Sequence, residues 1–210
     1  MKHRMIARLI NQSNRIEFLA NQHDNETLNV SFGTDADPDR YPWAVALSGN
    51  DRDRCGGTLI DDQHILTAAH CIGTRTTRVS LGSHLYNSGE IVKTNFYCVH
   101  HAYSSSTFYR NDLALIRLAK PVSVQYPKRI SSIEICQSNQ MLNKTLFTNH
   151  TDLWMIGWGL KNTEVEPNEL QEARVMLADR SMCKGSSRYT DVCVQSRSNT
   201  SPIGYAQEKM

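Results

Sequence analysis

The residue with the clearest chemical potential in this sequence of 210 residues is His70, because two cysteines bracket the segment that contains it. Residues 58–60 and 64–67 are short apolar runs, and the polar triplet between them predicts a tight β-hairpin. A crosslink between Cys55 and Cys71 would clamp this hairpin and stabilise it by roughly 3 kcal/mol. A rigidly held imidazole that titrates near neutral pH has the properties of a general base. For one histidine alone, an ordinary structural role beside a disulfide is the simpler alternative.

Asp112 is the second candidate, since it stands at the head of the apolar run 113–118. A carboxylate in this place either caps a turn or is buried and held for chemistry, and for the residue alone the cap is the simpler interpretation. The neighbours His100 and His101 suggest a metal site at first sight. Adjacent positions on a strand face opposite ways, so two such side chains rarely bind one ion. We therefore expect loop histidines and no metal site.

The composition predicts a soluble chain with one substantial core, because 40% of the residues are hydrophobic and the formal net charge is only +2. No run approaches the ~18 apolar residues of a membrane span. The charges are spread along the chain, which argues against nucleic acid as a partner. The six cysteines form no C-x-x-C pair, so neither zinc binding nor thiol redox chemistry is indicated.

Sequons for N-glycosylation are frequent and, together with an even number of cysteines, favour an oxidising, secretory environment. They begin at Asn11, Asn25, Asn29, Asn143, Asn149 and Asn199. Residues 1–20 fit a secreted protein less well. Arg8 interrupts their apolar patch and leaves no continuous h-region of the ~7–15 residues that a signal peptide needs. We expect either that the true start lies elsewhere or that this stretch is part of a propeptide. The expected location is extracellular.

Short alternating runs, such as residues 78–82 and 91–93, recur along the chain with Gly, Asn and Ser turns between them. This pattern is typical of an antiparallel barrel or sandwich and not of a βαβ fold. The second half repeats it, since residues 173, 175 and 177 place apolar side chains on one face of a further strand. We therefore predict an all-β protein.

Three segments carry a resemblance to a known family. Residues 67–71 (Thr-Ala-Ala-His-Cys), 111–118 and 153–159 resemble the histidine box, the aspartate box and the Gly-Trp-Gly strand of the chymotrypsin/trypsin-like serine proteases, peptidase S1. The order of His before Asp also fits this family. The resemblance implies two antiparallel β-barrels, protein or peptide substrates, and neither metal nor organic cofactor. It also implies that His70 is the base, and that Asp112 orients it and stabilises its imidazolium, as in the family's established triad.

The resemblance also implies a domain organisation. Residues 1–29 are polar and without alternation, which predicts a flexible, propeptide-like leader. The protease-like domain covers residues 30–210. Its first barrel spans about 42–135, its partial second barrel about 150–195, and a divergent tail follows at 196–210. The family's mature N-terminus would correspond to Val30, but Asn29 stands where a basic residue is expected and Phe32 replaces a glycine. Activation by a trypsin-like convertase is therefore not predicted, and residues 30–38 are expected to form an extended strand.

The family's disulfides suggest how the cysteines pair. The resemblance implies bridges between Cys55 and Cys71 and between Cys183 and Cys193. Whether Cys98 and Cys136 pair with each other is left open.

The family's nucleophile lies in Gly-Asp-Ser-Gly-Gly-Pro, and these residues contain no such segment. Ser196, Ser198 and Ser201 would need hydrogen-bond distance to His70, ~2.6–3.2 Å, and fixed amide donors for an oxyanion. A tail rich in Ser, Asn and Thr offers no tight turn to aim such amides, so we expect solvated serines. The leading interpretation is a C-terminally truncated serine endopeptidase homologue that is inactive in this form. The alternatives are a secreted pseudoprotease that binds a protein partner, and a truncated product without a stable fold.

Overall fold

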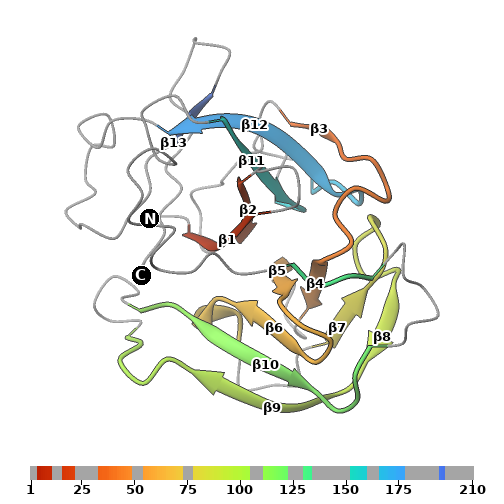
Figure 1. Ribbon diagram of the computed structural model, residues 1–210, viewed down its shortest axis with the longest axis vertical. Helices are drawn as coiled ribbons and strands as arrows, with labels where there is room; N and C mark the ends of the chain where they lie inside the picture. The colour runs from red at the N-terminus through yellow and green to blue at the C-terminus, as the bar shows by residue number, and fades with distance from the viewer. Residues whose placement is uncertain are drawn as a thin grey trace.

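The computed structural model describes ten segments of the chain. They are residues 4–10, 16–21, 33–48, 54–72, 78–104, 111–122, 130–133, 152–159, 166–177 and 194–196, with the backbone alone for 4–10, 16–21, 152 and 195–196. The described residues form β-strands and one short 3-10 turn, and among them there is no α-helix. The strands are arranged in two curled sheets that face each other (Figure 1). The all-β prediction is thus confirmed for this part of the chain.

The first sheet has seven strands in the order β8-β7-β4-β5-β6-β10-β9, and neighbouring strands run antiparallel. Its members are β4 (Ala44–Ser48), β5 (Arg54–Leu59), β6 (His64–Thr67), β7 (Arg78–Leu81), β8 (Glu90–Val92), β9 (Thr94–Val99) and β10 (Ala114–Leu118). The predicted hairpin is the pair β5–β6, in which Leu59 lies opposite Ile65. Both side chains are fully buried, because alternate residues of each strand face the interior of the curled sheet.

The second sheet has the order β1-β2-β11-β12-β13, with β3 also paired to β12. Its members are β1 (Arg4–Ile10), β2 (Ile16–Asn21), β3 (Thr34–Asp35), β11 (Asp152–Gly157), β12 (Gln171–Leu177) and β13 (Val194–Ser196). The predicted alternation in β12 is present, since Ala173 and Val175 are buried and Arg174 between them is exposed. Of the extended strand expected over residues 30–38, the described residues 33–38 contain only the two-residue strand β3, and a turn begins at Pro38.

The N-terminal segment differs from the flexible leader that the sequence suggested. Residues 4–10 and 16–21 form an antiparallel pair, and β2 pairs in parallel with β11 from Leu153 opposite Ile16 to Ile156 opposite Leu19. A strand at the edge of a sheet leaves a row of backbone N–H and C=O groups unpaired. In this structure β2 pairs with those groups along β11, and this pairing accounts for the strand structure of residues 16–21.

One buried ionic group connects the segment before β4 to the second sheet. Glu172 of β12 accepts a hydrogen bond from the guanidinium of Arg40 at 2.6 Å and another from the hydroxyl of Tyr41. The Arg40 guanidinium also lies over the ring of Trp154, 4.2 Å from its centroid. This contact ties the segment that leads into the first sheet to β12 of the second sheet. Among the described residues, no helix has the length and apolar character required to cross a membrane.

Candidate active site

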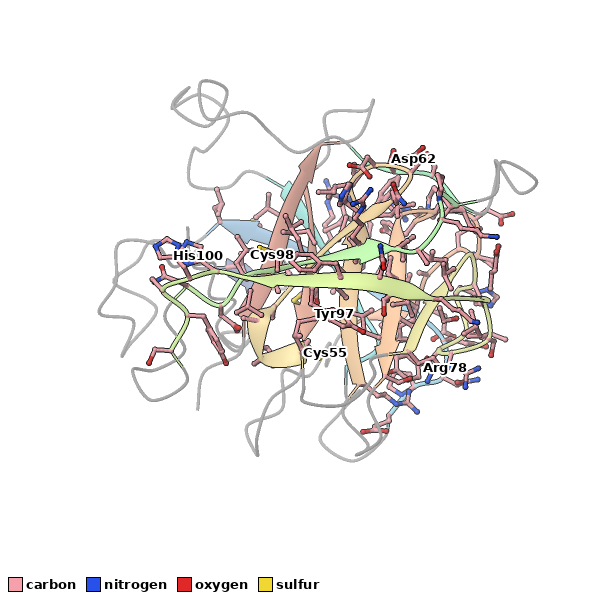
Figure 2. The ribbon with its side chains drawn as sticks, turned by 90° about the horizontal axis from the view of Figure 1, so that it is seen from below. Cys55, Asp62, Arg78, Tyr97, Cys98 and His100 are labelled. Carbon is pink, nitrogen blue, oxygen red and sulfur yellow. A yellow bond between two sulfur atoms is a disulfide. The ribbon has the colours of Figure 1, made fainter. Side chains whose placement is uncertain are left out.

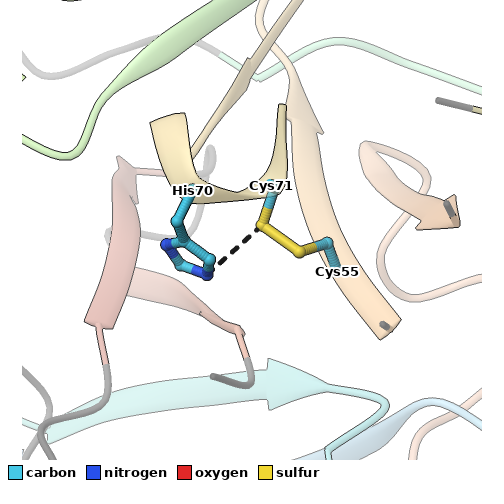
Figure 3. A group of neighbouring side chains, drawn as sticks. All are labelled: Cys55, His70 and Cys71. Carbon is cyan, nitrogen blue, oxygen red and sulfur yellow. Dashed lines mark hydrogen bonds between the residues drawn. A yellow bond between two sulfur atoms is a disulfide. The ribbon is translucent and has the colours of Figure 1, made fainter. Parts of the chain in front are cut away.

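His70 lies on the 3-10 turn η1 (Ala69–Cys71), which directly follows β6. Cys71 in the same turn is bonded to Cys55 on β5, with a separation of 6.0 Å between their Cα atoms (Figure 3). The pairing is the one that the resemblance implied. Thr67 at the end of β6 adds a hydrogen bond from its hydroxyl to the carbonyl oxygen of Gly56, at 2.9 Å. The turn that carries the imidazole is therefore fastened to the neighbouring strand at two points.

Asp112 lies two residues before β10 and holds His70 with both of its carboxylate oxygens. Oδ1 accepts the backbone N–H of His70 at 2.8 Å, and Oδ2 lies 2.6 Å from Nδ1 of the same residue. An ionised carboxylate only accepts hydrogen bonds, so Nδ1 must carry the proton. This contact leaves Nε2, on the far side of the ring, as the nitrogen that can accept a proton.

The register of two strands brings these residues together. β10 runs antiparallel to β6, with Ala114 opposite Thr67. His70 comes three residues after Thr67, and Asp112 comes two residues before Ala114, so both lie beyond the same end of this strand pair. Asn111 makes the turn into β10 with a positive φ of 53°, a backbone conformation that asparagine tolerates better than most residues. The amide of Asn111 donates to the carbonyl oxygen of Ala102 at 2.9 Å, which anchors this turn.

Both side chains of the pair are buried. The side chain of His70 is 6% exposed and that of Asp112 is 1% exposed. A charge-assisted hydrogen bond in such an environment is shorter and stronger than a neutral one. The low exposure means that water competes little for Asp112, so the ring orientation is well defined.

The hairpin turn itself is organised by Asp61. Its carboxylate accepts the backbone N–H groups of Gln63 and His64, at 2.8 and 2.7 Å, and lies 2.9 Å from Nδ1 of His64. Partial burial raises the pKa of Asp61, but the hydrogen bonds from Gln63 and His64 outweigh it and hold the pKa below its ordinary value. This turn fixes the β5–β6 register and thereby the position of η1.

The site does not provide a metal centre. Cys55, His70 and Cys71 place a set of possible ligand atoms within 4.8 Å of one another, and Nε2 of His70 lies 3.5 Å from the Cys71 sulfur (Figure 3). The two sulfurs are bonded to each other, so neither is the thiolate that a metal requires. Elsewhere, His100 and His101 follow the end of β9 and their rings stack, with centroids 4.6 Å apart. They lie in a loop, as predicted.

The structure describes only some of the other candidate residues predicted from the sequence. Cys98 on β9 is an exposed, free thiol, so it does not pair with Cys136 in this structure. Ser196 ends β13, where its backbone lies opposite Val175, and its side chain is not described. The remaining candidates lie outside the described residues: Asn11, Asn25, Asn29, Cys136, Asn143, Asn149, Cys183, Cys193, Ser198, Asn199 and Ser201.

Two features of this structure were not predicted from the sequence. The strand β2 lies in the second sheet, and its signal was present in the alternation of Ile16, Phe18 and Ala20. Glu172, which links the sheets through Arg40, carried no local signal because its partner is far away in the sequence.

Comparison with known proteins assigns the chain to a family. The family model described as Trypsin matches residues 30–203. The chain belongs to the trypsin family. Trypsin delta and trypsin gamma of Drosophila erecta are each 31% identical to it over 161 residues, which cover 74% of this chain and 60% of the relative. Coagulation factor IX of Cavia porcellus is 32% identical over 174 residues, which cover 79% of this chain and 59% of that protein. The chain thus spans about 60% of the length of these trypsin-family relatives.

A solved structure supports the same architecture. Neuropsin, described as a serine protease expressed in the limbic system of mouse brain, matches with a TM-score of 0.66 and 24% identity, over 84% of this chain and 79% of neuropsin. This likeness confirms the predicted trypsin-like fold with two barrels. The chymotrypsin/trypsin-like resemblance found in the sequence is confirmed as well.

Proposed function

We propose that this chain carries the proton-accepting part of a trypsin-like serine endopeptidase site, with His70 as general base and Asp112 as the residue that orients it. The observation that supports this proposal is the 2.6 Å contact between Nδ1 of His70 and Oδ2 of Asp112, together with the second bond from the His70 backbone. A single capping carboxylate needs only the backbone bond. The additional bond to the ring sets the tautomer, which is what a base acting through Nε2 requires.

The reaction class that fits this pair is acyl transfer from a peptide bond to a serine. In that reaction, Nε2 takes the proton from the serine hydroxyl as its oxygen attacks the carbonyl carbon, and Asp112 stabilises the resulting imidazolium. The proton then passes to the leaving amine. The substrates would be proteins or peptides, as for the family in general, and His70 and Asp112 perform their steps without a metal or an organic cofactor.

We propose in addition that the 210 residues alone do not hydrolyse peptide bonds at an enzymatic rate. They contain no Gly-Asp-Ser-Gly-Gly segment, which in this family provides both the nucleophile and the oxyanion-hole amides. Loss of one triad member lowers turnover by a factor of about 10⁴–10⁶ even where the oxyanion hole survives. Here both contributions would have to come from residues outside this sequence.

A second candidate function is a secreted pseudoprotease that binds a protein partner. It is favoured by exposed apolar side chains on the edge strand β9 and its neighbour β10, where Phe96 is 59% exposed and Leu115 is 37% exposed. Leu115 lies opposite the free Cys98 of β9, which Figure 2 labels, and Phe96 is two residues from Cys98, so these three side chains share one face of the β9–β10 pair. Exposed apolar side chains that gather in this way mark interaction sites more often than scattered ones do.

The secretory location is part of the proposal. The disulfide between Cys55 and Cys71 supports it, because such bonds persist in oxidising compartments. Expression in secretory cells, with an appended signal peptide, should give a product whose mass falls on treatment with an endoglycosidase. A product without glycans would contradict the use of the sequons.

The decisive experiment treats the purified, oxidised chain with a fluorophosphonate probe and weighs the protein intact. We expect no label on the deglycosylated chain of 23.8 kDa and no cleavage of peptide substrates. A recombinant trypsin-family enzyme with a complete triad is the positive control, and the His70→Ala variant is the matched negative control. Label that appears on the wild-type chain and disappears in His70→Ala would contradict the inactive form and identify a serine of this chain as the nucleophile. Stable capture of a protein partner, abolished by Phe96→Asp, would favour the pseudoprotease.

A further inference from the structure

The strand β11 has a second neighbour that comes from the N-terminus. One side of β11 pairs with β12, and the other pairs with β2 in parallel along four residue pairs, from Leu153–Ile16 to Ile156–Leu19. The far side of β2 pairs with β1, which forms the edge of the sheet. The N-terminal strand pair therefore fills an edge of β11 that would otherwise be open to another extended segment.

This strand pair also lies against the elements that carry the candidate base. β1 packs against β6, and β2 packs against β5, the two strands of the hairpin that leads into η1. In Figure 3 the N-terminal strands lie beside the imidazole of His70, with β11 beyond them. The His70 side chain is only 6% exposed. A general base must come within hydrogen-bond distance of the proton that it takes, so a substrate needs more access than this arrangement offers.

We infer that the edge of β11 beside His70 is a strand-binding site, and that β1 and β2 occupy it as an internal cover of the imidazole. The role of His70 as a base in this inference rests on the proposed function. The cover itself rests on strand pairing alone. Parallel pairing is slightly less stable per residue than antiparallel pairing, and β1 has no further strand beyond it in the described sheet. The cover is therefore a displaceable element, and an extended peptide segment is the kind of ligand that replaces it.

The test measures how fast diethyl pyrocarbonate modifies each histidine of the full, oxidised chain, with the sites resolved by peptide mass spectrometry. His64 is the internal reference, because its side chain is 38% exposed and lies in the same hairpin. We expect His70 to react more slowly than His64 by a factor of about 10 or more, because the label reaches it only after local opening. The variant Glu17→Pro removes a backbone donor from the middle of β2 and should raise the His70 rate severalfold while the His64 rate stays the same. Glu17→Gln is the matched control, since it keeps the backbone donor, and should leave both rates unchanged.

A second variant covers the case in which proline prevents folding. Glu17→Gly weakens the strand without removing its donor and should give a smaller rise of the His70 rate in the same direction. Hydrogen exchange of the β11 amides reports in parallel whether β2 has separated from β11. If the β11 amides of a folded variant lose protection but its His70 rate does not change, the proposed cover of His70 is wrong. The result is independent of the proposed function, because the label reports access to His70 whether or not the chain has protease activity.

Discussion

Asp112 holds His70 at two points, with one carboxylate oxygen on the backbone N–H and the other on Nδ1 of the ring. The distances are 2.8 and 2.6 Å, and the carboxylate that makes both bonds is almost fully buried. Position and tautomer of the imidazole are thus set by one side chain. Asp112, which supplies this side chain, lies in a turn 42 positions after His70 in the chain.

Asp112→Asn should reverse the tautomer of His70. The single amide oxygen can accept the backbone N–H, which leaves the NH₂ group facing Nδ1, so the ring must move its proton to Nε2. Nitrogen chemical shifts in ¹⁵N NMR distinguish the two tautomers directly. Asp62→Asn changes an exposed carboxylate and should leave the His70 signals as they are. Retention of the Nδ1–H form in Asp112→Asn would contradict the role assigned to this residue.

Removal of the disulfide should destabilise the chain strongly. The bond joins residues 16 positions apart, and a closed loop of this size contributes about 3 kcal/mol in the chain-entropy model. We expect Cys55→Ala combined with Cys71→Ala to lower the free energy of unfolding in urea by about that amount. Cys98→Ser, which alters an exposed free thiol, should stay within about 0.5 kcal/mol of the wild type. Equal unfolding midpoints for all three proteins would show that the clamp adds no stability.

Glu172→Ala should weaken the connection between the two sheets. It removes the acceptor of Arg40 and Tyr41, and a hydrogen bond to a charged group contributes about 1.5–3 kcal/mol. Because Arg40 is partly exposed and can regain water, we expect a loss of about 2 kcal/mol, measured by chemical denaturation. Tyr41→Phe should cost about 1.5 kcal/mol, and this cost should be smaller in the Glu172→Ala background. Additive losses in this cycle would mean that the hydroxyl and the carboxylate act independently.

The turn at Asp61 predicts a pH dependence. In the folded chain its pKa lies below the ordinary value of 3.8, so the folded state favours the ionised carboxylate. Asp61 therefore stabilises the fold at pH values above ~3.8. The contribution is lost as the pH falls through the lowered pKa of the folded state. The difference in melting temperature between the wild type and Asp61→Asn should therefore be small but positive at pH 6 and shrink below pH ~3.8. A difference that grows on acidification would have the wrong sign for this mechanism.

Local patterns were sufficient to predict much of the site from the sequence. The two apolar runs of the β5–β6 hairpin, the cysteines that bracket it and the apolar run after Asp112 each depend on neighbours in the chain. Period-two alternation determines which face of a strand is buried, so β7, β8 and β12 could be anticipated as well. The family followed from the same short segments, because the geometry around His70 needs particular residue types at particular spacings.

The tertiary structure alone decided the partners of groups far apart in the sequence. Nothing near Ile16 indicates that its strand pairs with β11, since any open edge accepts a strand and the choice depends on what the rest of the chain leaves unpaired. The same holds for Glu172 and Arg40, which are 132 positions apart and have no local pattern in common. Strand formation is encoded by neighbouring residues, whereas edge pairing and buried ion pairs arise only when the whole chain has placed two distant surfaces in contact.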